Sequence, residues 1–232
     1  MVEQTQFILA SSSPRRRELL ALAGWKFNII PAQVDETPLP YEDSRRYVLR
    51  MAESKALCVA GQAPENNLVI GADTIVVDKP VGDQFAPGSG QEILGKPADA
   101  HEAFQMLLRL RGHTHQVITA VAIVAVNDRE VIGDLCTTDV TMREYTNEEI
   151  AAYVASGDPF DKAGGYAIQH EGFHPVESIR GCYANVVGLP LCTVRRLLGK
   201  FNIEPQTDLV EACQADLDFQ CEVYQQIVDK KI

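Results

Sequence analysis

Apolar runs suited to β-strands alternate along this chain with amphipathic segments suited to helices. This alternation is typical of an α/β fold, in which helices and a sheet bury each other's apolar faces. The last two apolar runs are separated only by residues 127–130, so we expect an antiparallel hairpin there and a mixed sheet overall. Strands are predicted at residues 7–10, 27–31, 68–77, 116–126 and 131–142.

Capping residues mark the ends of the predicted helices. Pro14 suits the first position of a helix and Gly24 suits its end, which predicts a helix over residues 14–23. Thr146 and Glu149 have the spacing of a capping box, so another helix is predicted from there to residue 156. The remaining helices are predicted at residues 44–59, at residues 100–110 after Asp99, and at residues 189–198.

The charge balance and the cysteine pattern exclude several classes of protein. A total of 21 Lys and Arg against 32 Asp and Glu gives a net charge of −11, which argues against broad binding to nucleic acid or to an anionic membrane. No run approaches the roughly 20 apolar residues of a membrane span and no secretory signal is evident, so we expect a cytoplasmic protein. The 6 cysteines include no Cys-x-x-Cys pair, which favours reduced, mostly buried thiols over a disulfide framework or a zinc site.

Two segments are interpreted as additions to a body of residues 1–203. Residues 81–91 are rich in glycine and poor in apolar side chains, which predicts a mobile surface loop. Residues 204–232 are a predicted C-terminal extension with apolar side chains at near-helical spacing, which predicts one amphipathic helix that packs on the body or on a partner, as in a homodimer. The apolar positions are Leu209, Cys213, Leu217, Cys221, Tyr224 and Val228.

Three arginines, Arg15 to Arg17, lie in the first turn of the first predicted helix. A helix N-terminus carries partial positive charge, so guanidinium groups there cost a few tenths to about 1 kcal/mol. An anion held by the arginines, by the hydroxyls of Ser11 and Ser13 and by backbone N–H groups would offset that cost, as in phosphate sites at helix N-termini. The alternative is a solvated run of charge.

Two acidic positions follow predicted strands. Asp73 comes shortly after the apolar run of residues 68–70, and Glu36, next to Asp35, follows the second strand. Ligands of open α/β sheets bind beyond the carboxyl ends of the strands, so Asp73 and Glu36 are candidates to hold magnesium and a polyphosphate. Asp73 is also a candidate base, and its alternative role is to cap a turn.

Two further motifs resemble well-known sites, a Walker A loop and a histidine metal site, but do not meet their requirements. Residues 90–97 nearly match a Walker A loop, but Pro97 stands where the magnesium-binding Ser or Thr is required. Lys96 therefore keeps only the role of a point-charge contact to phosphate. His113 and His115 are interpreted as surface residues rather than as metal ligands, because no Cys or carboxylate is near them in the sequence.

A glycine-containing segment, residues 161–169, supplies a cation and an amide. The cation is Lys162, and the amide is Gln169, which is able to read the edge of a base. Alone this segment would be an ordinary loop, but near residues 185–190 it fits the wall of a pocket closed by the start of a helix.

Taken together, these segments resemble the Maf family of nucleoside triphosphate pyrophosphatases. They occur in the family's order over about residues 7–200, and the ordered set is specific although each piece is weak by itself. The matching pieces are residues 9–16, 35–36, 52–56, 71–74, 94–97, 161–166 and 188–190.

The resemblance implies an elongated α/β fold around a twisted mixed sheet with flanking helices, similar to inosine triphosphate pyrophosphatases. It implies two lobes with the nucleotide in a cleft between them. It also implies hydrolysis of a nucleoside triphosphate to the monophosphate and pyrophosphate with a divalent cation, Mg²⁺ or Mn²⁺, for which Glu36 and Asp73 are the expected ligands.

The resemblance also assigns roles to single positions. Asp73 matches the family's proton-accepting catalytic position, and the other catalytic-site positions match Arg16, Glu36, Lys55 and Lys96. Residues expected to contact substrate are Ser11, Ser13, Arg15, Thr74, Lys162 and Gln169. Among these, Arg15, Thr74 and Gln169 match the positions linked to substrate choice, in the combination of the branch that resembles dTTP/UTP pyrophosphatases.

Two other functions stay open at this point. The family has also been linked to septum formation, so the chain could be a nucleotide-binding regulator of cell division with little catalysis. The set of Asp73, Glu36 and Lys96 favours the enzyme, because a sensor has no need of a catalytic carboxylate and a metal site together. A weaker alternative is a phosphatase that releases inorganic phosphate one group at a time.

Overall fold

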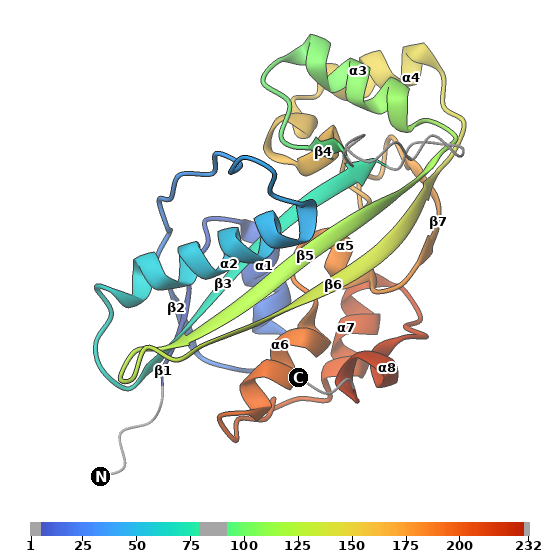
Figure 1. Ribbon diagram of the computed structural model, residues 1–232. Coiled ribbons are helices and arrows are strands. Elements are labelled where there is room, and N and C mark those ends of the chain that lie inside the picture. Colours follow the sequence, from blue (N-terminus) through green and yellow to red (C-terminus); the bar gives the residue numbers. More distant parts are fainter. Residues whose placement is uncertain (1–5, 79–91, 230–232) are drawn as a thin grey trace. The chain divides into compact units, whose positions relative to one another are not determined.

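The computed structural model describes residues 6–78 and 92–229, and within them seven strands form one sheet. The strand order is β2-β1-β3-β5-β6-β7, and β4 pairs with β3 beside this path. β2 and β3 run parallel to β1, whereas β4 is antiparallel to β3 and β7 is antiparallel to β6. The predicted α/β class and mixed sheet are confirmed (Figure 1). The strands are β1 (Gln6–Leu9), β2 (Phe27–Ile29), β3 (Asn67–Asp78), β4 (Glu92–Leu94), β5 (Thr114–Ala125), β6 (Val131–Met142) and β7 (Val176–Arg180).

The helices begin where local signals place them. Ser13 caps α1 by accepting a hydrogen bond from the Arg16 N–H at 3.4 Å, and Thr146 and Glu149 form the predicted capping box of α4. The helices are α1 (Pro14–Ala21), α2 (Ser44–Ala60), α3 (Ala100–Leu110), α4 (Asn147–Ala155), α5 (Tyr183–Val187), α6 (Leu191–Gly199), α7 (Leu209–Leu217) and α8 (Tyr224–Val228), with 3-10 turns η1 (Asp158–Asp161) and η2 (Ala163–Gly165). None of the helices in the described ranges combines the length and the apolar character that crossing a bilayer requires.

The chain divides into two compact units. The first unit comprises Met1–Asp73, Thr119–Cys136 and Cys182–Ile232. The second unit comprises Thr74–Ile118 and Thr137–Gly181. Strands β3, β5 and β6 each supply residues to both units, and β3 passes from one to the other between Asp73 and Thr74.

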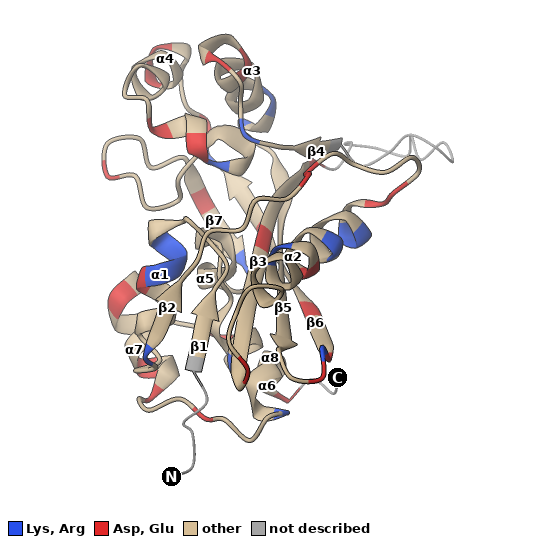
Figure 2. Cartoon of the chain, turned by 90° about the vertical axis from the view of Figure 1, so that its left-hand side faces the viewer, with Lys and Arg blue, Asp and Glu red and all other residues tan. Residues whose placement is uncertain are grey.

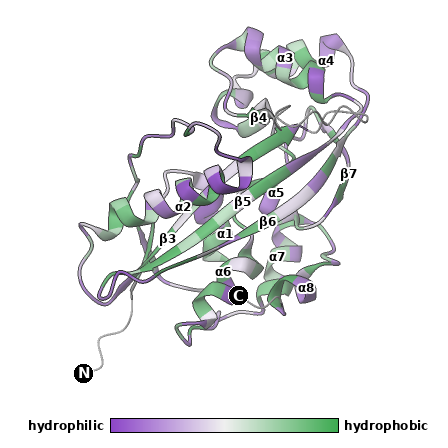
Figure 3. Ribbon diagram, viewed as in Figure 1, coloured by the Kyte–Doolittle hydropathy of each residue, from purple (hydrophilic) through white to green (hydrophobic). Residues whose placement is uncertain are grey.

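In the first unit, helices cover both faces of the sheet. Helix α2 lies on one face, whereas α1 and α5 lie together on the other (Figure 1). Most of the strand residues between are buried, and β3 and β5 are largely green in Figure 3, as expected for strands buried on both faces. Leu9, Ile70 and Met51 of α2 are fully buried, and each such side chain contributes about 1.5–3 kcal/mol through removal from water.

Gly71 of β3 allows this strand to lie directly against α2. A Cβ at this position would come within 2.8 Å of the backbone N of Ala56, which is closer than real Cβ atoms approach, and would clash with the carbonyl of Ala52. Any larger residue would therefore push α2 away from the strand two residues before Asp73. The close packing fixes the distance between Asp73 and the side chains that α2 carries.

In the second unit, α3 and α4 pack against each other, and the 3-10 turns pack beside them. Leu107 and Leu110 of α3 are fully buried, and the Tyr145 hydroxyl donates a hydrogen bond to the carbonyl of Leu107 at 2.7 Å. The buried aromatic rings of Tyr145, Tyr153 and Phe173 form a cluster in this unit, with Phe173 in contact with both tyrosines.

The C-terminal extension differs from the prediction. One terminal helix was expected, but the structure has two, because Asp218 adopts a left-handed conformation (φ 46°) and ends α7. Of the two packings left open, on the body or on a partner, the structure shows the first, since α7 contacts α5 and α6, and the Gln206 N–H donates to the carbonyl of Ala23 at 2.9 Å. The division at residue 203 stays a prediction, and the loop predicted at residues 81–91 lies outside the described residues.

Candidate active site

The ammonium group of Lys55 lies between two carboxylates in the first unit. Its Nζ is 2.6 Å from Asp73 Oδ1 and 2.7 Å from Glu36 Oε1. Lys55 comes from α2, Asp73 from β3 and Glu36 from the loop after β2, so the contact joins three elements that are separate in the sequence. The side chains of Lys55 and Asp73 are mostly buried, with 14% and 12% of their surfaces exposed, and that of Glu36 is 53% exposed. This arrangement forms a partly open anionic site filled by one cationic group.

Arg16 is fixed beside the same carboxylates. Its Nε donates to the carbonyl of Gly188 and its Nη1 to the carbonyl of Ala72, each at 2.9 Å. Burial lowers the pKa of this guanidinium, while the nearby charges of Asp73 and Glu36 oppose that effect. The side chain is thus held in place by backbone atoms next to Asp73, with its charge directed at the anionic site.

The turn between β1 and α1 carries the predicted serines. Ser11 is buried and its Oγ accepts from the Ser13 N–H at 3.2 Å, while the Ser13 Oγ accepts from the Arg16 N–H at 3.4 Å. Both hydroxyls keep a proton that they could donate to an anion. Arg15, at the second position of α1, is partly exposed, and Figure 2 shows the basic residues of this helix in blue. Contact of this turn with substrate stays a prediction.

Tyr47 belongs to this site and was missed by the sequence analysis. Its hydroxyl donates to the backbone carbonyl of Glu36 at 2.9 Å. Burial, together with the nearby charges of Asp73 and Glu36, raises the pKa of Tyr47 to about 12, so the hydroxyl keeps its proton. The available signal was the spacing of Tyr47, Met51 and Lys55, which places all three on one stripe of α2.

An ion pair between Arg50 and Glu42 also attaches the loop that carries Glu36 to α2. Arg50 of α2 binds Glu42 through Nε at 2.6 Å and Nη2 at 2.5 Å, and it donates to the carbonyl of Thr37 at 3.2 Å. A bidentate pair of this kind restrains geometry as well as adding energy. The loop that presents Glu36 is therefore attached to α2 at three points, Glu36, Thr37 and Glu42.

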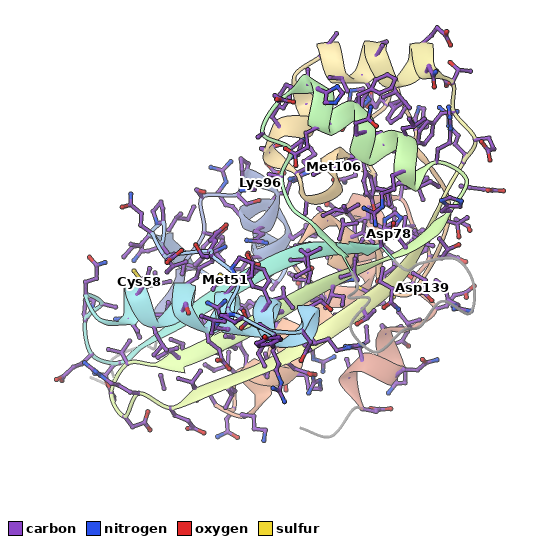
Figure 4. All side chains as sticks on the ribbon, turned by 45° about the horizontal axis from the view of Figure 1, so that its top comes forward. Met51, Cys58, Asp78, Lys96, Met106 and Asp139 are labelled. Atoms are coloured by element: carbon purple, nitrogen blue, oxygen red, sulfur yellow. The ribbon has the colours of Figure 1, made fainter. Side chains whose placement is uncertain are left out.

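The second unit carries four of the predicted substrate or catalytic-site residues. Thr74 follows Asp73 directly in β3 and is partly buried. Lys96, labelled in Figure 4, is exposed on the segment between β4 and α3. Gln169 is exposed in the turn that precedes β7. The Gly164 N–H donates to the carbonyl of Gly95 at 2.9 Å, which joins the segment of Lys96 to the segment of Lys162.

Lys162 is buried and its ammonium has three protein acceptors. These are the carbonyl of Asp158 at 2.6 Å, Asp158 Oδ1 at 2.8 Å and Asp161 Oδ1 at 2.6 Å. An ammonium has three N–H groups, so this set satisfies it completely. Contact of Lys162 with a phosphate stays a prediction, and it would require one of these acceptors to be exchanged.

His115 corrects the prediction that both neighbouring histidines lie on the surface. His113 is exposed, but His115 is fully buried, and its Nε2 lies 2.7 Å from the Tyr166 hydroxyl. The reason is that His115 lies within β5, which begins at Thr114, with its side chain on an interior face. Burial lowers the pKa of His115 to about 4, so its imidazole is neutral at pH 7.

The anionic site suits a hard divalent cation. Within residues 6–78 and 92–229 no group of three or more His, Cys, Asp or Glu side chains is arranged to hold a metal, so Glu36 and Asp73 are a pair without a third ligand of these types. Mg²⁺ usually binds in this way, through one or two carboxylates plus water and substrate phosphates. The two carboxylates converge on Lys55 Nζ, so a metal ion held by both of them would share them with this ammonium or displace it.

Comparison with known proteins gives a consistent set of relatives. Residues 6–201 match the family model "Maf-like protein". The chain is 46% identical over 198 residues to a dTTP/UTP pyrophosphatase of Escherichia coli O157:H7 and to one of Shigella sonnei, in each case over 85% of this chain and 94% of the relative. It is 45% identical over the same length to a protein of Shigella flexneri named nucleoside triphosphate pyrophosphatase.

Solved structures give weaker matches. A dITP/XTP pyrophosphatase from Mycobacterium abscessus matches with a TM-score of 0.35 and 16% identity, over 60% of this chain and 74% of that one. The Ham1 protein of Staphylococcus aureus matches with a TM-score of 0.41 and 15% identity, over 74% of this chain and 80% of that one.

Proposed function

Since the chain belongs to the Maf-like protein family, which its residues 6–201 match, we propose that it is a nucleoside triphosphate pyrophosphatase acting on dTTP and UTP. The proposed reaction adds water across the bond between the α- and β-phosphates and yields a nucleoside monophosphate and pyrophosphate. The names of the relatives support this activity. The observation that carries the proposal is the convergence of Asp73 and Glu36 on one cationic group next to Arg16.

In this proposal Asp73 orients and deprotonates the attacking water. Its carboxylate is mostly buried and restrained by Lys55, so it approaches the reaction with little reorganisation. A divalent cation, Mg²⁺ or Mn²⁺, held by Glu36 and Asp73, would stabilise negative charge on the phosphate oxygens. Arg16 and Lys55 add positive charge where charge develops at the α-phosphate and on the leaving pyrophosphate.

The remaining assignments follow the family resemblance. Arg15, Ser11 and Ser13 are proposed to bind phosphate at the start of α1, where N–H groups and the helix dipole favour anions. Lys96 is proposed as a further phosphate contact, and Thr74 and Gln169 as the residues that select the base. A cytoplasmic location and a homodimer are kept as proposals with them.

The site favours catalysis over the regulatory alternative. A protein that only senses a nucleotide needs cationic groups for the phosphates, but it does not need two carboxylates directed at one point beside them. A role in cell division would then be an addition to the activity rather than a substitute for it.

Product analysis tests the proposal. The purified chain is incubated with Mg²⁺ and each of dTTP, UTP, CTP, ATP, GTP and 7-methyl-GTP, and pyrophosphate and phosphate are measured separately. We expect pyrophosphate with every substrate that reacts, with kcat/KM highest for dTTP and UTP, lower for CTP and lowest for the purines. Release of phosphate without pyrophosphate would contradict the reaction, and a purine as best substrate would contradict the assigned branch.

Gln169→Ala tests the assignment of the base-reading residue. The amide offers both a donor and an acceptor to the O4/N3 edge shared by uracil and thymine, and cytosine reverses the order at position 4. We expect the variant to flatten the ranking of UTP over CTP more than it weakens inhibition by pyrophosphate. An unchanged ranking would remove Gln169 from the proposal and leave the hydrolysis untouched.

A further inference from the structure

The hydroxyl of Tyr153 forms hydrogen bonds with both ends of residues 158–167, the segment that leads to Gln169. The Tyr153 hydroxyl, at the end of α4, donates to Asp158 Oδ2 at 2.6 Å and accepts from the Ala167 N–H at 3.0 Å. Asp158 begins this segment and Ala167 lies two residues before Gln169. A single side chain thus closes residues 158–167 into a loop.

The other carboxylate oxygen of Asp158 binds a residue within the same loop, Lys162. Asp158 Oδ1 accepts from the Lys162 ammonium at 2.8 Å, so the carboxylate is shared between Lys162 and Tyr153. Burial acts to raise the pKa of Asp158, but the hydrogen bonds from Lys162 and Tyr153 outweigh it and leave the pKa below its ordinary value. Lys162 is itself buried, and a buried ammonium is stable only with acceptors of this kind.

Packing fixes the position of the Tyr153 ring. The ring stacks on Phe173 at a centroid distance of 4.5 Å and forms a T-shaped contact with the ring of His170 at 4.7 Å, and the residue is 3% exposed. Tyr153 therefore contacts the chain on both sides of Gln169, through Ala167 before it and His170 after it. Gln169 itself is exposed, so its side chain has little packing of its own to hold it.

The proposal rests on the base-reading role given above to Gln169. We infer that Tyr153 is a positioning residue for base selection: its hydroxyl, together with the Asp158–Lys162 pair, holds the turn from which Gln169 presents its amide. Tyr153 touches no substrate in this account. It limits the directions in which the amide can point, and selectivity between uracil and cytosine depends on that direction because the two bases differ in donor and acceptor order.

The test compares four main variants of the full chain by kcat/KM for UTP and for CTP, and a fifth variant, Asp158→Asn, repeats it at the partner of the Tyr153 hydroxyl. Tyr153→Phe removes the hydroxyl and keeps the ring. Tyr145→Phe is the matched control, because Tyr145 is similarly buried in the same unit, contacts Phe173 and donates its hydroxyl to the carbonyl of Leu107 on α3. Gln169→Ala and the double variant Tyr153→Phe with Gln169→Ala complete a double-mutant cycle.

We expect Tyr153→Phe to lower the UTP/CTP ratio of kcat/KM by about fivefold, the scale of one lost hydrogen bond, and Tyr145→Phe to leave the ratio unchanged. The double variant should have the same ratio as Gln169→Ala alone, since Tyr153 acts through Gln169. Inhibition by pyrophosphate should be equal in all four. Asp158→Asn, which keeps the size of the side chain, should lower the ratio in the same direction and serves if Tyr153→Phe does not fold.

Three results would overturn the inference. One is an unchanged ratio in Tyr153→Phe and Asp158→Asn while Gln169→Ala lowers it. Another is an equal effect of Tyr145→Phe, which would indicate general loosening of the unit. The third is a further fall in the double variant, which would show that Tyr153 acts independently of Gln169. An unchanged ratio in Gln169→Ala would instead remove the base-reading role on which the inference rests.

Discussion

Each unit holds a lysine between two carboxylates, but the two clusters differ in how far apart their residues are in the sequence. In the first unit, Lys55 joins Glu36 and Asp73, which come from a loop and a strand far apart in the sequence. In the second unit, Lys162 joins Asp158 and Asp161, which lie within four residues of it on one turn. The first cluster exists only because distant elements pack together. The second cluster is local in the sequence, because its lysine and both of its carboxylates lie within residues 158–162.

We infer that this difference separates a group available for chemistry, Lys55, from a group used mainly for structure, Lys162, against the sequence-based prediction that Lys162 contacts substrate. Lys55 has one contact to each of two carboxylates, and the side chain of Glu36 is 53% exposed, so we expect ligands to reach this site from the side of Glu36. Lys162 has three acceptors and is 8% exposed, and one of its acceptors is also bound by Tyr153. We therefore expect substitutions in the first cluster to lower catalytic activity and substitutions in the second to lower the free energy of unfolding.

The largest effect is expected at Asp73. Asp73→Asn keeps the size of the side chain and an oxygen that can accept from Lys55, but it removes the base, so kcat should fall by at least about 100-fold. Asp78→Asn is the matched control on the same strand, because Asp78 pairs with Arg109 at 2.5 Å and has no part in the proposed reaction. Initial rates of pyrophosphate release and thermal unfolding of both variants check this. Equal losses in the two variants would contradict the assignment of Asp73.

Substitution of the two lysines should affect different quantities, activity for Lys55 and stability for Lys162. Lys55→Met should lower kcat/KM for UTP by about 100-fold, the scale of losing one group that stabilises developing charge. Lys162→Met should lower it by less than about tenfold but reduce the free energy of unfolding by about 1–3 kcal/mol, because it leaves the partly buried Asp158 with one fewer donor. Urea unfolding and steady-state kinetics measure both. If Lys162→Met inactivates a protein of unchanged stability, Lys162 contacts substrate and the contrast is wrong.

A smaller effect is expected from the buried histidine of the second unit. The pKa of His115 is about 4 in the folded protein against an ordinary value of 6.5, so the unfolded chain takes up the proton first as the pH falls. Its contribution to stability is complete above pH 6.5 and is lost progressively between pH 6.5 and 4, by about 2.5 kcal/mol at pH 4.5.

His115→Gln provides the comparison for that titration, since glutamine can bond the Tyr166 hydroxyl but does not titrate. Urea unfolding at pH 7 and pH 4.5 should show a loss of stability larger in the wild type than in the variant by about that amount. Carboxylates that titrate in the same range contribute to both proteins and cancel. An equal loss in the two proteins would mean that His115 is protonated without cost in the folded state.

The smallest effect on catalysis is expected from the C-terminal extension. Deleting residues 206–232 removes α7 and α8, which pack on α5 and α6 at a distance in sequence from every assigned catalytic position. We expect kcat and KM for UTP within about twofold of the full chain and a lower melting temperature, because the apolar surface of α6 becomes exposed. A large loss of activity in a folded variant would place the extension at the substrate.

Local signals in the sequence predicted much of the fold. The helix starts at Pro14 and Thr146 and the strands of the hairpin follow from capping and from apolar patterns, which act over a few residues. Short elements were missed: β7 has the sequence Val-Glu-Ser-Ile-Arg, whose polar residues resemble a loop, and β4 is only three residues long. The left-handed Asp218, which breaks the terminal helix, had no signal in the apolar spacing.

The site was predicted as a set of residues but not as an arrangement. The resemblance named Asp73, Glu36 and Lys55, yet their contact depends on α2 packing against Gly71, which is a property of the folded chain. For the same reason the anchoring role of Tyr47 could not be read from the sequence, and His115 was assigned to the surface. Contacts between elements that are distant in the sequence could not be predicted from this one sequence.

The most direct test of the central claim is hydrolysis of UTP in water enriched in ¹⁸O. The claim is that water held by Asp73 attacks the α-phosphorus, so the new oxygen belongs to the monophosphate. Mass spectrometry of the products should find one ¹⁸O in UMP and none in pyrophosphate, with the same pattern at a much lower rate in Asp73→Asn. Label in pyrophosphate would place the attack at the β-phosphorus and contradict the account.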